Sequence, residues 1–145
     1  MKQTIEKNSN KIPTVKFGEH LIFDAYGCNP KKLNDLQFCH DLLYTLSKKA
    51  DMHILCPPFL VKAEGNETLG GKDPGGYSGF LIIMESHISI HTFVKRGYVT
   101  IDLYSCKPFP SDGITEFLVE AFEAKDYSVF KMDRGLKYPA ENIYE

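Results

Sequence analysis

Residues 77–106 read YSGFLIIMESHISIHTFVKRGYVTIDLYSC and predict three consecutive β-strands. The first, Tyr77–Met84, is a nearly continuous apolar run with the length of a buried strand. The second covers His87–Val94, and Lys95–Gly97 then turns the chain. Tyr98–Cys106 alternates apolar and polar residues, so its two faces differ in character. Because the connections are short, we expect the three strands to run antiparallel.

The flanking sequence adds two helices and three more strands. Both helical segments have apolar residues at helical spacing and begin with residues that can cap a helix, Asn34-Asp35 and Ser111-Asp112. The expected elements are strands over Glu19–Tyr26, His53–Leu55 and Tyr127–Met132 and helices over 34–49 and 111–124. The Gly-rich, charged stretch 62–76 is expected to be a long loop. This order predicts an α+β fold, a two-layer sandwich in which two helices cover one face of an antiparallel sheet.

Length and charge limit the kinds of partner. The chain has 145 residues, enough for a single domain over residues 1–145 with one core. Its net charge of -2 gives no basic excess for binding nucleic acid or an anionic membrane. No stretch approaches the roughly 20 apolar residues of a membrane helix, and Met1–Lys11 lacks the apolar run of a signal peptide. We therefore expect a cytoplasmic protein that binds neither nucleic acid nor a membrane.

The cysteine and histidine spacings do not favour a metal site. The four cysteines form no CxxC pair, and three of them are expected to be inert core residues. His87 and His91 are four residues apart on a predicted strand, a separation of roughly 13 Å, too far for one ion to bridge. No metal is therefore expected.

Ser86 follows a carboxylate residue at the start of the second strand. Its hydroxyl can attack the carbonyl carbon of the Glu85 peptide if that peptide is strained or immobilised and a proton carrier is near. His91 can carry the proton, and Ser78 on the neighbouring strand can supply a hydroxyl donor. β-Elimination of the resulting ester, followed by hydrolysis, leaves a pyruvoyl group. On the residues alone, a polar strand end without chemistry explains the same pattern.

Residues 85–92, ESHISIHT, strongly resemble the processing segment of the short bacterial and archaeal S-adenosylmethionine decarboxylases, whose pattern is E-S-H-[LI]-[TS]-I-H-T. The resemblance extends to Tyr77-Ser78-Gly79 and to residues 98–106, YVTIDLYSC, which is similar to the family's strand ending in cysteine. Residues 20–30, HLIFDAYGCNP, resemble its opening strand and turn. The match covers roughly residues 19–122, and its central motif is specific.

The resemblance implies a role for five residues. Glu85 becomes the C-terminus of one fragment, and Ser86 becomes the covalently bound pyruvoyl group of the other. His91 and Ser78 fall on the family's processing residues, and Cys106 falls on its proton donor. The implied enzyme is a self-processing pyruvoyl-dependent carboxy-lyase of polyamine (spermidine) biosynthesis, a zymogen whose pyruvoyl group forms a Schiff base with its substrate. The resemblance also implies a homodimer whose active sites draw on both chains.

The predicted substrate pocket departs from the family. Phe59 is kept as a stacking ring, and Phe93 stands where the family usually has tryptophan. Lys95 stands where the family usually has a glutamate for the ribose hydroxyls, and a lysine cannot accept a hydrogen bond. Lys62 replaces another expected aromatic residue, while Asp73 could hold a distal cation. The substrate is therefore S-adenosylmethionine or, alternatively, L-ornithine or L-arginine. A catalytically inactive regulatory homologue is a third reading.

Overall fold

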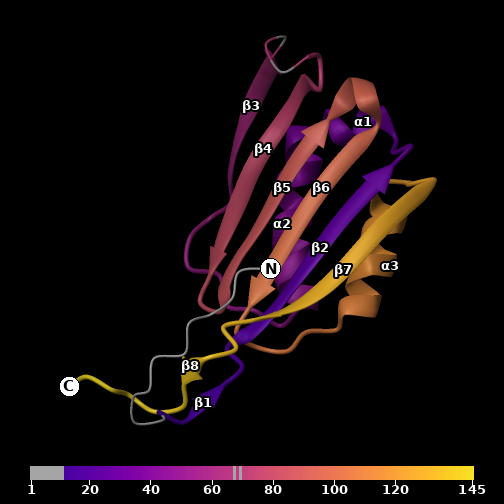
Figure 1. The fold of residues 1–145 in the computed structure, drawn as a ribbon. Helices are drawn as coiled ribbons and strands as arrows, with labels where there is room; N and C mark the ends of the chain where they lie inside the picture. The colour runs from indigo at the N-terminus through magenta and orange to yellow at the C-terminus, as the bar shows by residue number, and fades with distance from the viewer. Residues whose placement is uncertain (1–11, 67, 69) are drawn as a thin grey trace.

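The computed structural model describes residues 12–66, 68 and 70–145. Its main feature is a six-stranded antiparallel sheet in the order β3-β4-β5-β6-β2-β7 (Figure 1). The strands are β2 (Gly18–Tyr26), β3 (Phe59–Asn66), β4 (Asp73–Ile83), β5 (Ser86–Phe93), β6 (Tyr98–Ser105) and β7 (Asp126–Arg134). The two central strands, β5 and β6, therefore carry both the segment after Glu85 and the strand that leads to Cys106.

The helices lie on one face of this sheet (Figure 1). They are α1 (Pro30–Leu33), α2 (Leu36–Lys49) and α3 (Ser111–Ala121), and a 3₁₀ turn, η2 (Val94–Arg96), follows β5. The Asp35 carboxylate caps α2 by accepting a hydrogen bond of 2.9 Å from the Phe38 amide. This arrangement confirms the predicted α+β two-layer sandwich. None of the helices in the described part of the chain has both the length and the apolar character needed to cross a membrane.

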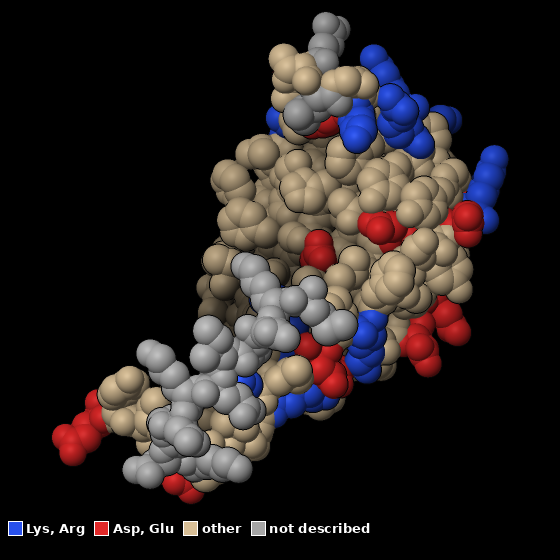
Figure 2. Space-filling view, viewed as in Figure 1, with Lys and Arg blue, Asp and Glu red and all other residues tan. Residues whose placement is uncertain are grey.

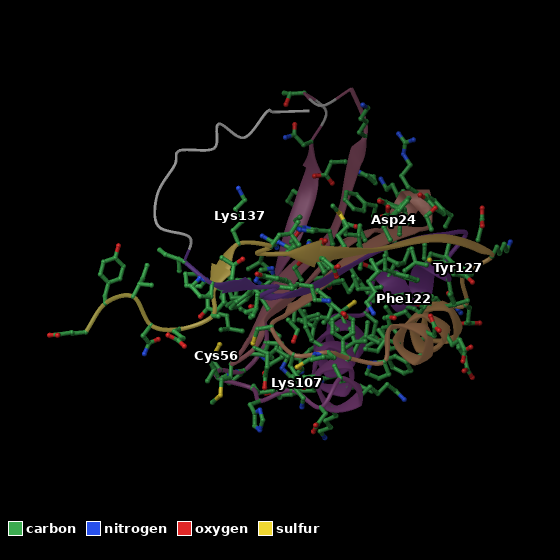
Figure 3. All side chains as sticks on the ribbon, turned by 60° about the horizontal axis from the view of Figure 1, so that its bottom comes forward. Asp24, Cys56, Lys107, Phe122, Tyr127 and Lys137 are labelled. Atoms are coloured by element: carbon green, nitrogen blue, oxygen red, sulfur yellow. The ribbon has the colours of Figure 1, made fainter. Side chains whose placement is uncertain are left out.

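The core lies between the sheet and the two longer helices. Figure 3 shows this layer edge-on, with Phe122 on the helical side of the sheet. Alternate residues of the central strands are fully buried there against α2 and α3 because strand side chains alternate between the two faces. The largest of these buried side chains include Leu21, Phe23, Leu81, Ile88, Ile90, Ile101 and Leu103 from the sheet and Leu43, Leu46 and Phe122 from the helical side.

The opposite face of the sheet carries no helix and exposes an unusual number of apolar side chains. Figure 2 views this open face and shows few charged side chains over its middle. The exposed apolar residues that the register places on it are Tyr26, Phe59, Val61, Phe80, Ile82, Phe130 and Met132. The polar residues of β5 and β6, among them His91 and Asp102, share this face.

The structure differs from the sequence-based expectation mainly over residues 62–76. The predicted long loop is wrong, because β3 and β4 continue through most of it and leave only residues 67–72 between them. The glycines serve close packing: a Cβ at Gly76 would lie 1.9 Å from the Thr92 carbonyl oxygen. The predicted strand over His53–Leu55 is reduced to one bridge, Ile54 to Ile83.

Smaller differences occur at the ends of elements. No side chain caps α3, whose N-cap residue is Pro110, so the predicted cap by Ser111-Asp112 is wrong. In the C-terminal tail, β8 (Tyr138–Pro139) pairs with β1 (Thr14–Val15), and the pair extends away from the main sheet (Figure 1).

Two leucines of α2 differ sharply in their burial. Leu43 is fully buried, whereas Leu36 is 46% exposed. We expect Leu43→Ala to lower the free energy of unfolding by about 2–5 kcal/mol because it leaves a cavity. Leu36→Ala is the matched control and should change it by less than about 0.5 kcal/mol. Urea unfolding followed by circular dichroism measures both, and equal losses would contradict this account of the core.

Candidate active site

The hairpin between β4 and β5 strains the residue that follows Glu85. Met84 and Glu85 form its two-residue turn, and Ile83 pairs with Ser86 across it. Favoured two-residue turns place a positive φ within the turn, usually on Gly, Asn or Asp. Here neither turn residue has a positive φ, and Ser86 takes φ = 150° instead. A non-glycine residue held there stores about 1–3 kcal/mol, so the strain sits directly beside the Glu85–Ser86 peptide bond.

The Glu85 carbonyl is polarised by a backbone donor. The amide of Cys106 donates a hydrogen bond of 2.9 Å to the Glu85 carbonyl oxygen. The register explains this contact, because Ser86 is paired with Ser105 and Cys106 is the next residue after it. An attack on the carbonyl carbon moves negative charge onto that oxygen, and a fixed N–H donor stabilises the charge.

The Glu85 carboxylate is buried, with the residue only 6% exposed. It accepts a hydrogen bond of 3.0 Å from the His53 amide, and its other oxygen lies 2.6 Å from His53 Nδ1. Burial is the largest single influence and raises the pKa of the Glu85 carboxyl. The hydrogen bonds from the His53 side chain and amide, the hydrogen bond from the Glu85 amide and the charge of His53 together outweigh it, so the pKa lies below its ordinary value. The carboxylate is therefore ionised at neutral pH.

Ser78 and His91 form a hydroxyl–imidazole pair on the open face. They are direct partners in the β4–β5 ladder, and Ser78 Oγ lies 2.9 Å from His91 Nδ1. The pair lines a shallow hollow of about 230 Å³ whose wall is largely apolar. The other lining residues are Phe59, Val61, Gly79, Phe80 and Ser89. A hydroxyl and an imidazole in contact can pass a proton to or from a group bound in this hollow.

Within one chain this pair does not reach Ser86. His91 follows Ser86 by five residues on β5, which corresponds to roughly 16 Å along an extended strand. Cys106, by contrast, directly follows Ser105, the ladder partner of Ser86, and its side chain is exposed. The structure therefore places Glu85, Ser86 and Cys106 at one end of the sheet and Ser78 and His91 nearer its middle.

The predicted substrate residues are spread over the sheet. Phe59 lines the hollow beside the Ser78–His91 pair. The Phe93 ring lies 5.2 Å from the Tyr98 ring at the end of β5 remote from Ser86, and Lys95 follows in η2. Asp73 accepts a hydrogen bond of 3.0 Å from the Gly75 amide at the start of β4. One chain does not bring Phe93, Lys95 or Asp73 to Ser86, and their substrate-binding roles stay predictions.

Sequence reasoning missed an aromatic and charged cluster near Cys106. Asp102 Oδ1 lies 2.7 Å from His20 Nε2, and the Arg134 guanidinium stacks 3.9 Å from the centre of the Tyr104 ring. Burial, followed by the nearby His20 and Arg134, lowers the pKa of His87. The polar alternation of residues 98–106 was the available signal, but the partners on β2 and β7 become evident only from the sheet order.

The cysteines separate into buried and accessible thiols. Cys28 and Cys39 are buried, and burial raises the pKa of Cys28 to about 11 and that of Cys39, also raised by Asp35, to about 12. Cys56 is half-buried and Cys106 is exposed, so two rather than three cysteines are core residues. Among the residues that the structure describes, no group of three or more His, Cys, Asp or Glu side chains could hold a metal ion.

The family model for S-adenosylmethionine decarboxylase matches residues 19–135. The chain belongs to this family. Two S-adenosylmethionine decarboxylase proenzymes are similar to it along most of their length. The one from Thermodesulfovibrio yellowstonii is 33% identical over 120 residues, which is 82% of either chain. The one from Pyrococcus abyssi is 30% identical over 128 residues, 87% of this chain and 84% of the relative.

A solved structure shares the fold of this S-adenosylmethionine decarboxylase family member. The crystal structure of the adenosylmethionine decarboxylase from Aquifex aeolicus superimposes with a TM-score of 0.70, covering 88% of this chain and 98% of that chain at 24% identity. The family membership that residues 85–92 indicated is confirmed by the family match over residues 19–135 and by these relatives.

The lowered pKa of Glu85 predicts a pH-dependent contribution to stability. A carboxyl whose pKa is depressed on folding stabilises the fold above its ordinary value, here 4.5, and loses that contribution as the pH falls through the lower folded value. We therefore expect Glu85→Gln to destabilise the chain at neutral pH and to matter progressively less below pH 4.5.

Urea unfolding at several pH values measures this effect, with Ser86→Ala as the common background so that every chain stays intact. If the difference in unfolding free energy between Ser86→Ala and Ser86→Ala/Glu85→Gln grew as the pH falls, the expected direction of the pH dependence would be wrong.

Proposed function

We propose that the chain cleaves itself between Glu85 and Ser86, converts Ser86 into a pyruvoyl group and uses that group to decarboxylate S-adenosylmethionine. The observation that carries the proposal is the peptide bond itself: Ser86 is strained at φ = 150° and the Glu85 carbonyl accepts a 2.9 Å hydrogen bond from Cys106. The names of the relatives, decarboxylase proenzymes, support both the cleavage and the substrate. The enzyme would be a carboxy-lyase of polyamine biosynthesis, releasing decarboxylated S-adenosylmethionine and carbon dioxide.

The cleavage begins with Ser86 Oγ attacking the Glu85 carbonyl carbon. The Cys106 amide stabilises the charge that develops on the carbonyl oxygen, and collapse breaks the C–N bond to give an ester and a free amine on residue 86. Removal of the Ser86 Cα proton by the His91 imidazole expels the Glu85 carboxylate and leaves dehydroalanine. Tautomerisation to an imine and hydrolysis then release ammonia and leave the pyruvoyl group at the new N-terminus.

A pyruvoyl group at position 86 suits its surroundings, because it needs no binding pocket of its own and the chain generates it in place. Bound to the substrate amine, such a group withdraws the electrons released when carbon dioxide leaves. Cys106, which is exposed and follows the ladder partner of Ser86, would return a proton to the substrate α-carbon. In the same arrangement the Cys106 amide would serve cleavage and the Cys106 thiol would serve turnover.

The proposed mechanism requires two copies of the chain. Because His91 lies roughly 16 Å from Ser86 along β5, a His91 that acts on Ser86 must come from a second copy. In a two-fold symmetric pair such a contact is reciprocal, so one dimer contains two equal sites. The exposed apolar residues of the open face support this pairing, since exposed apolar side chains on both sides of the polar residues of β5 and β6 are typical of an interaction surface.

Autocleavage is the direct test of the proposal. Freshly purified protein should separate on a denaturing gel into two fragments divided after Glu85, and mass spectrometry should find a pyruvoyl group in place of Ser86. Ser86→Ala should give one intact chain without decarboxylase activity, a loss of at least about 10³-fold because the group that withdraws electrons is absent. An intact wild-type chain that decarboxylates its substrate would refute the proposal.

Cys106→Ala provides the matched control, because it removes the thiol and keeps the amide. It should be cleaved nearly as fast as the wild type and lose turnover. The assay follows carbon dioxide release from S-adenosylmethionine, with L-ornithine and L-arginine in parallel, since Lys95 stands where the family usually has a glutamate. Release from either amino acid alone would overturn the proposed substrate.

Co-expression of two inactive chains tests the shared site. Ser86→Ala alone and His91→Ala alone should both stay uncleaved. In a mixed dimer, one site combines the intact Ser86 of the His91→Ala chain with the intact His91 of the Ser86→Ala chain. The His91→Ala chains in mixed dimers should therefore be cleaved, as measured on differently tagged chains. If the isolated mixed dimers were not cleaved, the proposal that His91 acts on the Ser86 of its partner would be wrong.

A further inference from the structure

His53 contacts both residues of the turn that precedes Ser86. Its amide donates to the Glu85 carboxylate at 3.0 Å, and its ring nitrogen Nδ1 lies 2.6 Å from the other carboxylate oxygen. Its carbonyl oxygen accepts a hydrogen bond of 2.8 Å from the Met84 amide. The backbone and side chain of His53 therefore bind both residues of the Met84–Glu85 turn.

The two residues before His53 are themselves fixed to the strand end that carries Cys106. The Asp51 carboxylate and the Asp51 carbonyl each lie 2.6 Å from Lys107 Nζ. The Ser105 hydroxyl lies 3.5 Å from Met52 Sδ and also contacts the backbone of Lys107 at 2.8–2.9 Å. Residues 51–53 thus connect the Glu85 turn to the Ser105–Lys107 turn, the two segments that meet at the Glu85–Ser86 peptide bond.

We propose that His53 is a positioning residue for self-cleavage, an inference that rests on the function proposed above. Because the Glu85 carboxylate is buried and held by the His53 amide and imidazole, rotation of the Glu85 residue is restricted. The Glu85 carbonyl oxygen then keeps its hydrogen bond from the Cys106 amide. The strained φ also remains at Ser86, because the turn residues cannot rotate to relieve it. His53 acts only through Glu85 and touches none of the reacting atoms.

The exposure of the His53 side chain separates this role from a contribution to the core. The imidazole is 68% exposed, whereas the Glu85 side chain is 7% exposed. In the described part of the chain, Glu85 is the only side chain that the imidazole contacts through a hydrogen bond or ion pair. Removing the imidazole should therefore leave the fold intact and loosen only the turn.

The test measures the rate of cleavage of precursor made by cell-free synthesis and sampled over time on a denaturing gel. His53→Ala should slow cleavage by about tenfold, the size expected for losing one hydrogen bond to a buried charge. His53→Asn should recover much of the rate, since its amide nitrogen can donate in place of Nδ1. His40→Ala is the matched control, because it removes an imidazole that also contacts a carboxylate, Asp41 at 3.2 Å, but on α2.

A coupled variant separates positioning from a general loss of stability. With Glu85→Gln already present, adding His53→Ala should slow cleavage no further. In the Ser86→Ala background, His53→Ala should lower the midpoint of urea unfolding by no more than Glu85→Gln does, because the imidazole stabilises the fold only through the Glu85 carboxylate. The proposal would be overturned by a wild-type cleavage rate in His53→Ala, by further slowing in the Glu85→Gln background, or by a larger loss of stability that asparagine does not rescue. An uncleaved wild-type chain would instead overturn the proposed function.

Discussion

The hydrogen bond from the Cys106 amide to the Glu85 carbonyl is the contact on which the candidate site depends. It forms because β5 and β6 are neighbours in register, with Ser86 opposite Ser105. A shift of β5 by one residue in that register would remove the donor from the carbonyl and would also turn core residues of β5, such as Ile88, to the open face. The hydrophobic pattern that fixes the fold therefore also fixes the peptide bond that the chain is proposed to break.

The arrangement of this sheet also explains why the proposed mechanism requires a second copy of the chain. Helices cover one face, so the apolar residues of β4 to β6 find a core there, while the open face keeps Ser78, His91 and several exposed aromatic side chains. A second copy of the chain, as proposed above, would cover this face and would also supply the imidazole that a single chain does not bring to Ser86. Folding, assembly and maturation would then draw on the same surface.

How well each strand could be predicted from the sequence depended on whether one of its faces is buried. Strands that bury one face, such as β6, show period-2 alternation and were predicted within a residue or two of their ends. β3 was missed because it is an edge strand with every residue half-buried or exposed, and β4 began earlier than expected because its glycines carry no side chain to form a pattern. The motif residues Ser86, His91 and Cys106 were found by resemblance, but their distribution over the sheet required the register.

His53 could not be found from sequence, because it lies 32 residues from Glu85 outside any regular strand, and the contact exists only after the sheet has formed. The strain at Ser86 also bears on the stability of the fold. A strained Ser86 costs roughly 1–3 kcal/mol, a large share of the 5–15 kcal/mol that stabilises a typical domain, so the rest of the fold must hold it. The proposed cleavage would turn residue 86 into a chain terminus, which has no φ, and would therefore release this strain. In that case the strain that the fold holds at Ser86 would favour the cleaved chain over the precursor.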